Sequence, residues 1–324
     1  NKKTTNSPIW LMRQAGRYLP EFRKIRKQNP DFINLCLNEN LSSEITLQPL
    51  KRFELDAAII FSDILMLPYG LNQKVNFKKN FGPELGLLNL EIISRVDNLT
   101  FLKKLQPVYQ SIKKVRENSL LENKNLIGFV GAPWTLLVYM INRHSPKKEL
   151  KKNFFEDEDL IKKTLIILDK FLKLHIDQQI KNGASVIQIF DSWAGLLQEK
   201  DLPKYIYAPT LSLVNYIKSL NIPVICFPRG VKNYKNFCDN VKPDVVNIDY
   251  EIDPISICKE INTPIQGGLD PRILLTDTEN LKKHALRYLE IFKDHPYIFN
   301  LGHGVLPETN PNMVDYLVKM VKDY

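Results

Sequence analysis

Seven short apolar runs recur along the chain, and segments with helical periodicity separate most of them. Each run has the length and apolar character of a strand that is buried in a parallel sheet. The runs are Ala57–Phe61, Leu126–Val130, Val186–Phe190, Pro223–Phe227, Val245–Ile248, Thr263–Ile265 and Tyr297–Leu301. Strands that alternate with helices predict a parallel sheet of the α/β class.

The segments between and after these runs predict the helices. Helical periodicity is found at Asn98–Leu121, Asp157–Lys181, Tyr205–Leu220, Glu279–Lys293 and Pro311–Asp323. Leu71–Asn89 lacks it and indicates an inserted hairpin or loop. An eighth strand is not evident from the apolar pattern.

Two architectures fit this order, a closed (β/α)8 barrel and a doubly wound sheet. Polar or glycine-rich residues follow almost every predicted strand, from Ser62-Asp63 to Gly302-His303-Gly304. A barrel builds its site from all of its βα-loops, whereas a doubly wound sheet concentrates such residues at one crevice. No GxGxxG or GxxxxGK[ST] motif occurs. We therefore predict a single, somewhat distorted (β/α)8 TIM-barrel domain over residues 1–324, with its active site at the C-terminal ends of the strands.

The charge and the cysteines bear on partners and compartment. The net charge is +9, but the lysines are spread along helix-like stretches and no nucleic-acid-binding motif occurs, so we interpret it as a solvated basic surface that attracts anions. Cys36, Cys226, Cys238 and Cys258 form no CxxC pair, as expected in a reducing compartment. No apolar run is long enough for a membrane span, and Asn1–Thr4 contains no signal-peptide-like stretch. We expect a cytoplasmic protein that binds neither nucleic acid nor a membrane.

The segment Pro8–Arg23 is dense in Trp, Met, Tyr and Arg, and it suggests an anion site. Arg13 and Arg17 are four residues apart, with Gln14, Ala15 and Gly16 between them. Two guanidinium groups can hold carboxylates bidentately, and small residues between them leave backbone N–H groups accessible. The alternative is a surface loop whose arginines pair with acidic residues.

Four other strand ends carry candidate residues. Asp63 ends an apolar run, where an acid is costly without partners, although it can also serve as a turn or capping residue. Tyr139 lies one helical turn beyond Thr135, and its hydroxyl needs a partner if it is buried. Ser192 and His303 each follow a strand, but no GxSxG elbow supports a hydrolytic triad with Asp63. The histidine and cysteine spacing does not suggest a metal site.

The chain resembles the uroporphyrinogen decarboxylase family from near its first to its last residues. The most specific match is PIWLMRQAGRYLPEFR. Six shorter motifs match in the same order: FSDIL, GFVGAPWTLLVYM, FDSWAG, FPRG, GGLDP and NLGHG. Seven motifs in register are far more specific than any one of them.

The resemblance implies a homodimeric (β/α)8 barrel that converts uroporphyrinogen III to coproporphyrinogen III in haem biosynthesis, without metal or organic cofactor. It implies that the substrate is bound by Arg13, Gln14, Ala15, Gly16, Arg17, Asp63, Tyr139, Ser192 and His303. Among these, Asp63, Arg13 and Tyr139 are expected to be catalytic. Asp63 would stabilise a cationic pyrrole intermediate, the arginines would bind the carboxylates, and the proton donor would be Arg13 or a bound water. We expect Met12, Phe61 and Phe129 to form apolar walls.

The sequence departs from the family pattern at three places. Gly268 stands where the family often has Asn, Tyr250 follows Asp249 where Trp is usual, and Lys78–Gly82 has fewer glycines than expected.

Two other functions were weighed against the sequence. One rival is a corrinoid-dependent methyltransferase, which would need zinc ligands at strand ends, but no HxC follows the last strand. The other is a non-catalytic porphyrin- or nucleic-acid-binding protein, which would be expected to lose Asp63 or an arginine.

Overall fold

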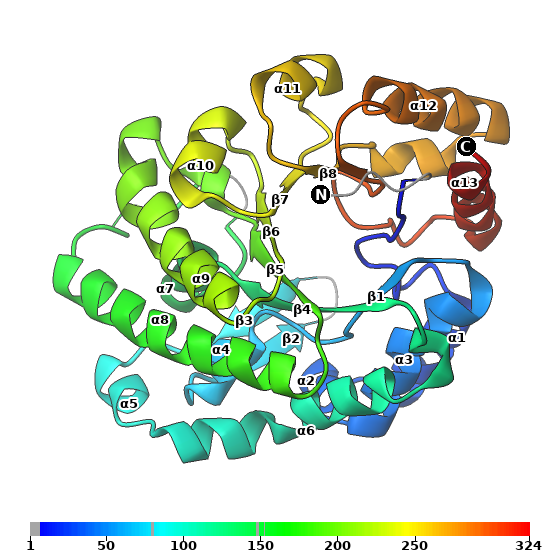
Figure 1. Cartoon of the computed structure of the whole chain (residues 1–324). Coiled ribbons are helices and arrows are strands. Elements are labelled where there is room, and N and C mark those ends of the chain that lie inside the picture. The colour runs from blue at the N-terminus through cyan, green and yellow to red at the C-terminus, as the bar shows by residue number, and fades with distance from the viewer. Residues whose placement is uncertain (1–6, 79–80, 147–148, 152) are drawn as a thin grey trace.

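The computed structural model describes residues 7–78, 81–146, 149–151 and 153–324, so the segment Asn1–Thr4, considered above for a signal peptide, lies outside the described residues. Within these ranges, a curled sheet of seven parallel strands has the order β1-β4-β5-β6-β7-β8-β9 (Figure 1). The strands are β1 (Ala57–Ile59), β4 (Asn125–Gly131), β5 (Val186–Asp191), β6 (Val224–Pro228), β7 (Val245–Ile248), β8 (Ile265–Gly267) and β9 (Tyr297–Ile298). Each strand therefore pairs with the next one of this sheet along the chain, which is the connectivity of successive βα units.

All seven predicted strands are confirmed, but only Val245–Ile248 has the predicted bounds; three others differ by one residue at one or both ends, and β1 stops at Ile59, two residues before the predicted end. The last two strands differ most. The predicted Thr263–Ile265 is shifted toward Gly267, and the predicted Tyr297–Leu301 is a strand only as far as Ile298. Beyond Ile298 the pairing continues only as isolated bridges, since Phe299 bridges Ile9 and Leu301 bridges Leu269, which follows β8. The apolar run thus continues past the end of the regular strand.

The segment Pro8–Trp10 lies between the two edge strands of the sheet. On one side, the Phe299 N–H donates to the Pro8 carbonyl at 2.8 Å, and the Trp10 N–H donates to the Phe299 carbonyl at 3.4 Å. On the other side, the Asp56 N–H donates to the Ile9 carbonyl at 2.9 Å. The segment therefore bonds both to the continuation of β9 and to the residue that precedes β1.

Helices lie on the outer side of the curled sheet (Figure 1). They are α1 (Pro20–Gln28), α2 (Phe32–Cys36), α3 (Glu39–Arg52), α4 (Met66–Gly70), α5 (Leu90–Ser94), α6 (Asn98–Arg116), α7 (Pro133–Asn142), α8 (Glu158–Lys181), α9 (Ala208–Ser219), α10 (Tyr234–Val241), α11 (Pro254–Glu260), α12 (Thr278–Ile291) and α13 (Pro311–Asp323). The five predicted helical segments are confirmed as α6, α8, α9, α12 and α13. Among the described residues, no helix combines the length and apolar character needed to cross a membrane.

The predicted insertion Leu71–Asn89 contains an antiparallel hairpin of β2 (Val75–Lys78) and β3 (Gly82–Leu85). The Leu85 N–H donates to the Arg143 carbonyl at 2.6 Å, which attaches the hairpin to the end of α7. The predicted unusual loop Lys78–Gly82 includes residues 79 and 80, which lie outside the described part of the chain.

Two apolar clusters and a polar layer surround the strands. The large cluster includes Phe61, which packs edge-on against Phe22 and Phe32 at 5.7 and 5.8 Å between ring centroids. The small cluster includes Trp10, Met12 and Phe227, with Phe129 packed against it. Met12 and Phe129 therefore pack in the same cluster, whereas Phe61 belongs to the other one.

A fully buried polar network connects Trp10 with three strands near this small cluster. The Trp10 indole N–H donates to Gln266 Oε1 at 2.9 Å. The Gln266 amide then donates to Gln188 at 3.2 Å and to Asn247 at 2.8 Å. Because buried amides need partners, this network fixes the position of the Trp10 segment against β5, β7 and β8.

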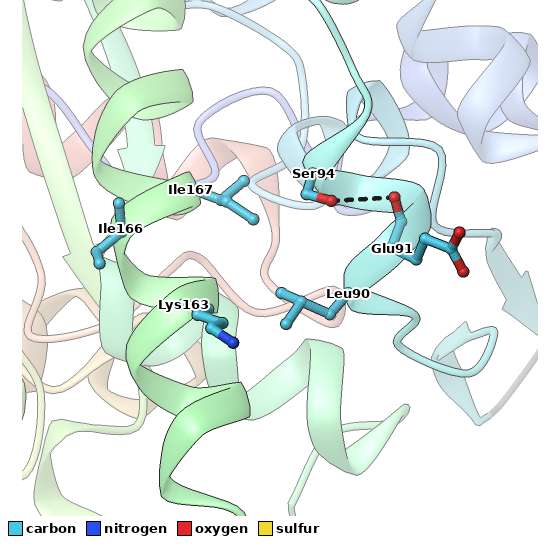
Figure 2. A pocket seen from close by; sticks show the side chains of 6 residues that line it. All are labelled: Leu90, Glu91, Ser94, Lys163, Ile166 and Ile167. Carbon is cyan, nitrogen blue, oxygen red and sulfur yellow. Dashed lines mark hydrogen bonds between the residues drawn. The ribbon is translucent and has the colours of Figure 1, made fainter.

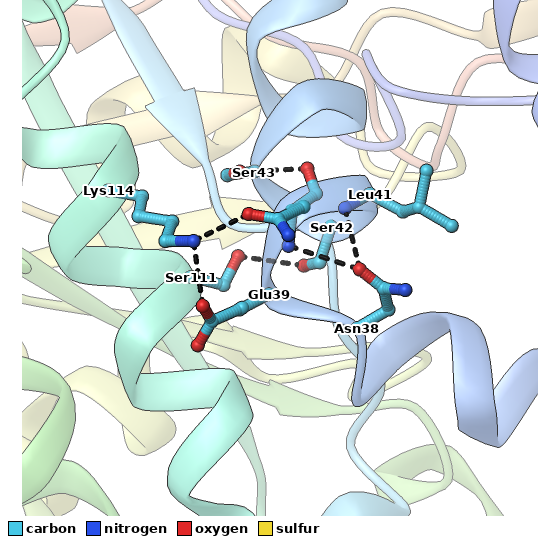
Figure 3. A network of polar contacts seen from close by, with 8 residues as sticks. Asn38, Glu39, Leu41, Ser42, Ser43, Ser111 and Lys114 are labelled. Carbon is cyan, nitrogen blue, oxygen red and sulfur yellow. Dashed lines mark hydrogen bonds and ion pairs between the residues drawn. The ribbon is translucent and has the colours of Figure 1, made fainter.

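Helix α3 holds the C-terminal end of β1. Figure 3 shows Ser42 of α3 bonded to Ser111 of α6, where the Ser111 hydroxyl donates at 2.9 Å. The Ser42 hydroxyl itself donates to the Phe61 carbonyl at 2.6 Å, and the Phe61 N–H donates to the Thr46 hydroxyl at 2.8 Å. Both backbone groups of Phe61 are thus paired with α3 side chains, two residues before Asp63.

Candidate active site

The predicted site residues lie beyond the C-terminal ends of different strands. Asp63 follows β1, Tyr139 is in α7 after β4, Ser192 follows β5 and His303 follows β9. Arg13 follows the Pro8–Trp10 segment between the two edges. Because all strands of a parallel sheet end at the same side, these residues belong to one rim.

Arg13 has an unusual backbone conformation. Its φ angle is 59°, a left-handed value that costs a non-glycine residue about 1–2 kcal/mol. The preceding residue is fixed on both sides, since the Met12 N–H donates to Asn300 Oδ1 at 3.0 Å and the Val305 N–H donates to the Met12 carbonyl at 2.9 Å. Such strain persists only where the surroundings impose it, and it is commonly found at functional sites.

The Arg13 side chain passes over Gly304. A Cβ atom on Gly304 would lie 2.3 Å from Arg13 Cδ, so only glycine leaves this path open. Among the described residues the Arg13 guanidinium makes no hydrogen bond, and its solvent-accessible end is free to bind an anion. Loss of hydration lowers the pKa of Arg13, and the charge of Arg17 lowers it further, while Asp63 acts in the opposite direction.

Gln14 has a structural role. Its buried side chain accepts the Leu11 N–H at 3.1 Å and donates to the Ala57 carbonyl at 3.1 Å, and its own N–H donates to the Leu11 carbonyl. The prediction of an accessible backbone N–H is therefore wrong for Gln14. The N–H groups of Ala15 and Gly16 make no hydrogen bond within the described ranges and stay available.

Asp63 combines the two interpretations that its position suggested. Its Oδ1 accepts the Leu65 N–H at 2.8 Å, which is the bond of a turn residue. Its other oxygen makes no hydrogen bond to a described residue and is not enclosed. Burial raises the pKa of Asp63 to about 6, although the Leu65 N–H and the Arg13 charge lower it in part. Asp63 is thus an anion at neutral pH with a free oxygen.

His303 is neutral. Its Nδ1 accepts the Gly304 N–H at 2.6 Å, so we infer that the proton is on Nε2, which can donate a hydrogen bond. Burial lowers the pKa of His303 to about 3, and the charges of Arg13 and Arg229 contribute to this. Of the two states considered from the sequence, protonated and neutral, the surroundings favour the neutral donor at physiological pH.

Tyr139 and Ser192 are positioned by a buried network at the ends of β4 and β5. The Thr135 hydroxyl donates to Asp191 at 2.6 Å and accepts the Trp193 N–H at 3.2 Å. The Trp193 ring in turn packs against Tyr139, with 5.9 Å between ring centroids. The Tyr139 hydroxyl accepts a long hydrogen bond of 3.4 Å from Ser145, and burial raises its pKa. The network fixes the backbone on both sides of Ser192.

Arg229 and Asp249 were not among the predicted site residues. They follow β6 and β7, and Arg229 Nε lies 3.7 Å from Asp249 Oδ2. The charge of Arg229 lowers the pKa values of Arg13 and His303, which places its guanidinium on the same rim. Both residues occur in the strand-end motifs of the sequence, so the rule that identified Asp63 could also have identified them.

Among the described residues, neither a metal-ligand cluster nor a hollow between two outer helices competes with this rim. No group of three His, Cys, Asp or Glu side chains that could hold a metal ion is found among the described residues. A hollow of about 590 Å³ lies between α5 and α8 (Figure 2). Its lining consists of Leu90, Glu91, Ser94, Lys163, Ile166 and Ile167. None of these residues is at a strand end, and none is a predicted site residue.

Comparisons with known proteins agree with the sequence motifs. A family model described as uroporphyrinogen decarboxylase (URO-D) matches residues 1–324. The uroporphyrinogen decarboxylase of Rickettsia bellii is 42% identical, over 98% of this chain and 95% of its own length. The uroporphyrinogen decarboxylase of Campylobacter jejuni is 39% identical, over 99% and 96%.

A solved structure shares the fold at low sequence identity. A methyltransferase from Methanosarcina mazei matches with a TM-score of 0.80 and 15% identity, over 99% of this chain and 95% of its own. Such a likeness shows the fold alone. The family model and the relatives at about 40% identity extend over nearly the whole chain, and on this evidence the chain belongs to the uroporphyrinogen decarboxylase family.

Proposed function

We propose that this protein removes CO2 from the four acetate side chains of uroporphyrinogen III and yields coproporphyrinogen III for haem biosynthesis. The family membership supports this activity. One observation on the site carries the proposed activity: Asp63, with one free oxygen, lies near the unpaired guanidinium of Arg13. This reaction needs an anion that stabilises the cationic ring and cations that bind the carboxylates of the substrate.

The chemistry explains why no cofactor is required. A pyrrole acetate has no acceptor for the electron pair that its departing CO2 leaves behind. Protonation of the adjacent ring carbon creates an iminium-like cation, which accepts that pair when the carbon–carbon bond breaks. Over the whole reaction each acetate takes up one proton, loses one CO2 and becomes a methyl group.

We assign Asp63 to the cation. Its free oxygen can accept hydrogen bonds from the pyrrole N–H groups, and its charge stabilises the positive ring as it forms. A fixed charge of this kind, with little reorganisation, is often the largest contribution to catalysis. The raised pKa of Asp63 leaves it ionised above about pH 6, which is the form required.

The other predicted residues would bind the substrate. Arg13 and Arg17, with the N–H groups of Ala15 and Gly16, hold carboxylates, while His303 donates through Nε2. Ser192 and Tyr139 supply neutral hydrogen bonds, and Tyr139 lies close enough to be affected electrostatically by Asp63 and Arg13. Arg13, whose pKa is lowered, and a bound water are the two candidate proton donors.

We also propose that the curled sheet is a single (β/α)8 barrel domain, closed by Pro8–Trp10 as its eighth strand. The hydrogen bonds of this segment to Phe299 and Asp56 support closure. Homodimer formation, a cytoplasmic location and the absence of nucleic-acid binding stay predictions. The four cysteines are free, as is usual in a reducing compartment.

Purified protein should convert uroporphyrinogen III to coproporphyrinogen III in the presence of a metal chelator. We expect kcat/KM to fall about tenfold for each pH unit below 6, because Asp63 becomes protonated there. Anaerobic assays between pH 5 and 8, with chromatography of the products, would measure the conversion and the pH dependence of kcat/KM. Absence of decarboxylation contradicts the function, and an acidic limb that persists unchanged in an Asp63→Asn variant contradicts the role of Asp63.

Replacing Gly304 with alanine should raise KM about tenfold without unfolding the protein. The new methyl group would occupy the path of Arg13 Cγ and Cδ, at 2.6 and 2.3 Å, and the flexible side chain would move away. Gly86→Ala is a matched control, because its Cβ would meet only Lys74, at 3.1 Å, in the hairpin region. Equal KM values for the two variants would show that the path of Arg13 over Gly304 does not matter.

A further inference from the structure

We propose that Arg229 is a third arginine of the site and binds a substrate carboxylate on the side of the rim formed by the middle strand of the sheet. This inference rests on the proposed function. Strand β6 has three strands on each side of it in the order β1-β4-β5-β6-β7-β8-β9. Arg13, by contrast, follows the segment that bonds to both edges. The two guanidinium groups therefore approach the substrate from different parts of the rim.

The backbone of Arg229 is firmly fixed. Its N–H donates to the Asp191 carbonyl at 3.0 Å, and its carbonyl accepts the Gly195 N–H at 3.0 Å. A Cβ atom on Gly195 would lie only 2.7 Å from the Gly230 carbonyl oxygen, so the two loops are in close contact. The backbone of Arg229 is thus anchored beside the residue that precedes Ser192, so the point from which its side chain leaves is set before any ligand arrives.

The guanidinium of Arg229 makes no hydrogen bond to a described residue. Its Nε is 3.7 Å from Asp249 Oδ2, which is too far for a hydrogen bond. Among the described residues no other acceptor lies within bonding distance of its nitrogens, and its side chain is 33% exposed. A structural arginine usually pairs bidentately with a carboxylate at about 2.8 Å. The guanidinium of Arg229 is instead free to receive such a carboxylate.

Asp249 provides a weak counter-charge. Its side chain is 7% exposed, its Oδ1 has no partner, and burial raises its pKa. The distance of 3.7 Å lets it balance the charge of Arg229 without occupying the donor groups. Since His303 is neutral, the cations at these strand ends are arginines, and a substrate with eight carboxylates needs more of them than Arg13 and Arg17 supply.

The test compares Arg229→Gln with Arg229→Lys and Asp249→Asn. Loss of a charge-assisted pair should raise KM for uroporphyrinogen III by about tenfold to a hundredfold in Arg229→Gln, with kcat within about threefold of the parent. Arg229→Lys should recover part of the affinity, since the charge remains but the planar fork is lost. Asp249→Asn should leave KM unchanged or lower it, because it removes the competing anion.

The double variant Arg229→Gln/Asp249→Asn separates binding from structure. If Arg229 only neutralises Asp249, the double variant recovers the KM and melting temperature of the parent. If Arg229 binds the substrate, KM stays raised in the double variant. A KM within twofold of the parent in folded Arg229→Gln overturns the inference while the activity stands; a parent without any decarboxylation overturns the proposed function itself. Should Arg229→Gln not fold, the KM of Arg229→Lys decides in the same way.

Discussion

Replacing Asp63 with asparagine is expected to lower kcat for uroporphyrinogen by about 10²–10³-fold, the usual effect of removing a preorganised electrostatic group. Asparagine has nearly the same shape, and its carbonyl oxygen can still accept the Leu65 N–H. The turn after β1 is therefore retained while the negative charge is lost. Steady-state rates at pH 7.5, with circular dichroism to verify folding, would measure the effect.

The stability of this variant distinguishes a catalytic acid from a structural one. The pKa of Asp63 in the folded protein is raised to about 6 from 3.8, so ionisation costs the folded state free energy. That cost is absent below about pH 4 and complete above about pH 6, and it is on the order of 3 kcal/mol. Asp63→Asn should therefore be at least as stable as the parent at pH 7.5, with no gain at pH 4.

Asp97→Asn is the matched control for Asp63→Asn. Asp97 also accepts a backbone N–H, from Thr100 at 2.8 Å, but it is exposed and not a strand-end residue. Its variant should keep normal kcat. Near-normal turnover of Asp63→Asn, or an equal loss in both variants, would contradict the role that we assign to Asp63.

Replacing Arg13 with glutamine should reduce kcat/KM by about 10²-fold or more. The guanidinium is free, lies beside Asp63 and Gly304, and is the best placed group for a substrate carboxylate. Truncating one partner of a desolvated charge pair typically costs about 2–5 kcal/mol. Arg13→Lys should restore only part of the loss, because an ammonium group cannot form the bidentate pair.

Stability measurements on Arg13 variants provide an independent check. Arg13 makes no hydrogen bond to a described side chain, and its backbone is strained at a φ of 59°. Arg13→Gly relieves that strain, so its free energy of unfolding should not fall even though activity is lost. A large loss of stability in Arg13→Gly would show that Arg13 is instead a structural residue.

The sequence predicts most of the regular structure, because buried strands and amphipathic helices have local patterns. The runs around β1 to β9 are of this kind, whereas the insertion at Leu71–Asn89 was recognised because helical periodicity is absent there. The Pro8–Trp10 segment is apolar as well, but its position between the two edges could not be predicted, since its partners Phe299 and Asp56 are distant along the chain.

The site was predictable as a set of residue types but not as a set of chemical states. Asp63, Ser192 and His303 were identified because polar residues that directly follow buried strands meet at one end of the sheet. Which state His303 adopts depends on burial and on Arg13 and Arg229, and none of these is visible in its neighbours along the chain. The backbone N–H of Gln14 was wrongly predicted to be accessible, because it donates to the Leu11 carbonyl, and the Gln14 side chain is held by Ala57 of a distant strand.

The attachment of Arg13 to both edges of the sheet has a consequence for biosynthesis. The hydrogen bond between Met12 and Asn300 joins residues that are 288 positions apart, so its contribution to contact order is large. During translation Pro8–Trp10 emerges early, but it cannot bond to Phe299 until β9 and the residues after it have left the ribosome. Asn300 is one of the groups that fix Met12 and therefore the turn at Arg13. A nascent chain or fragment that stops short of β9 should thus contain most of the secondary structure but lack a site that can bind carboxylates. Assembly of the last strand and onset of activity are expected to be a single, late event.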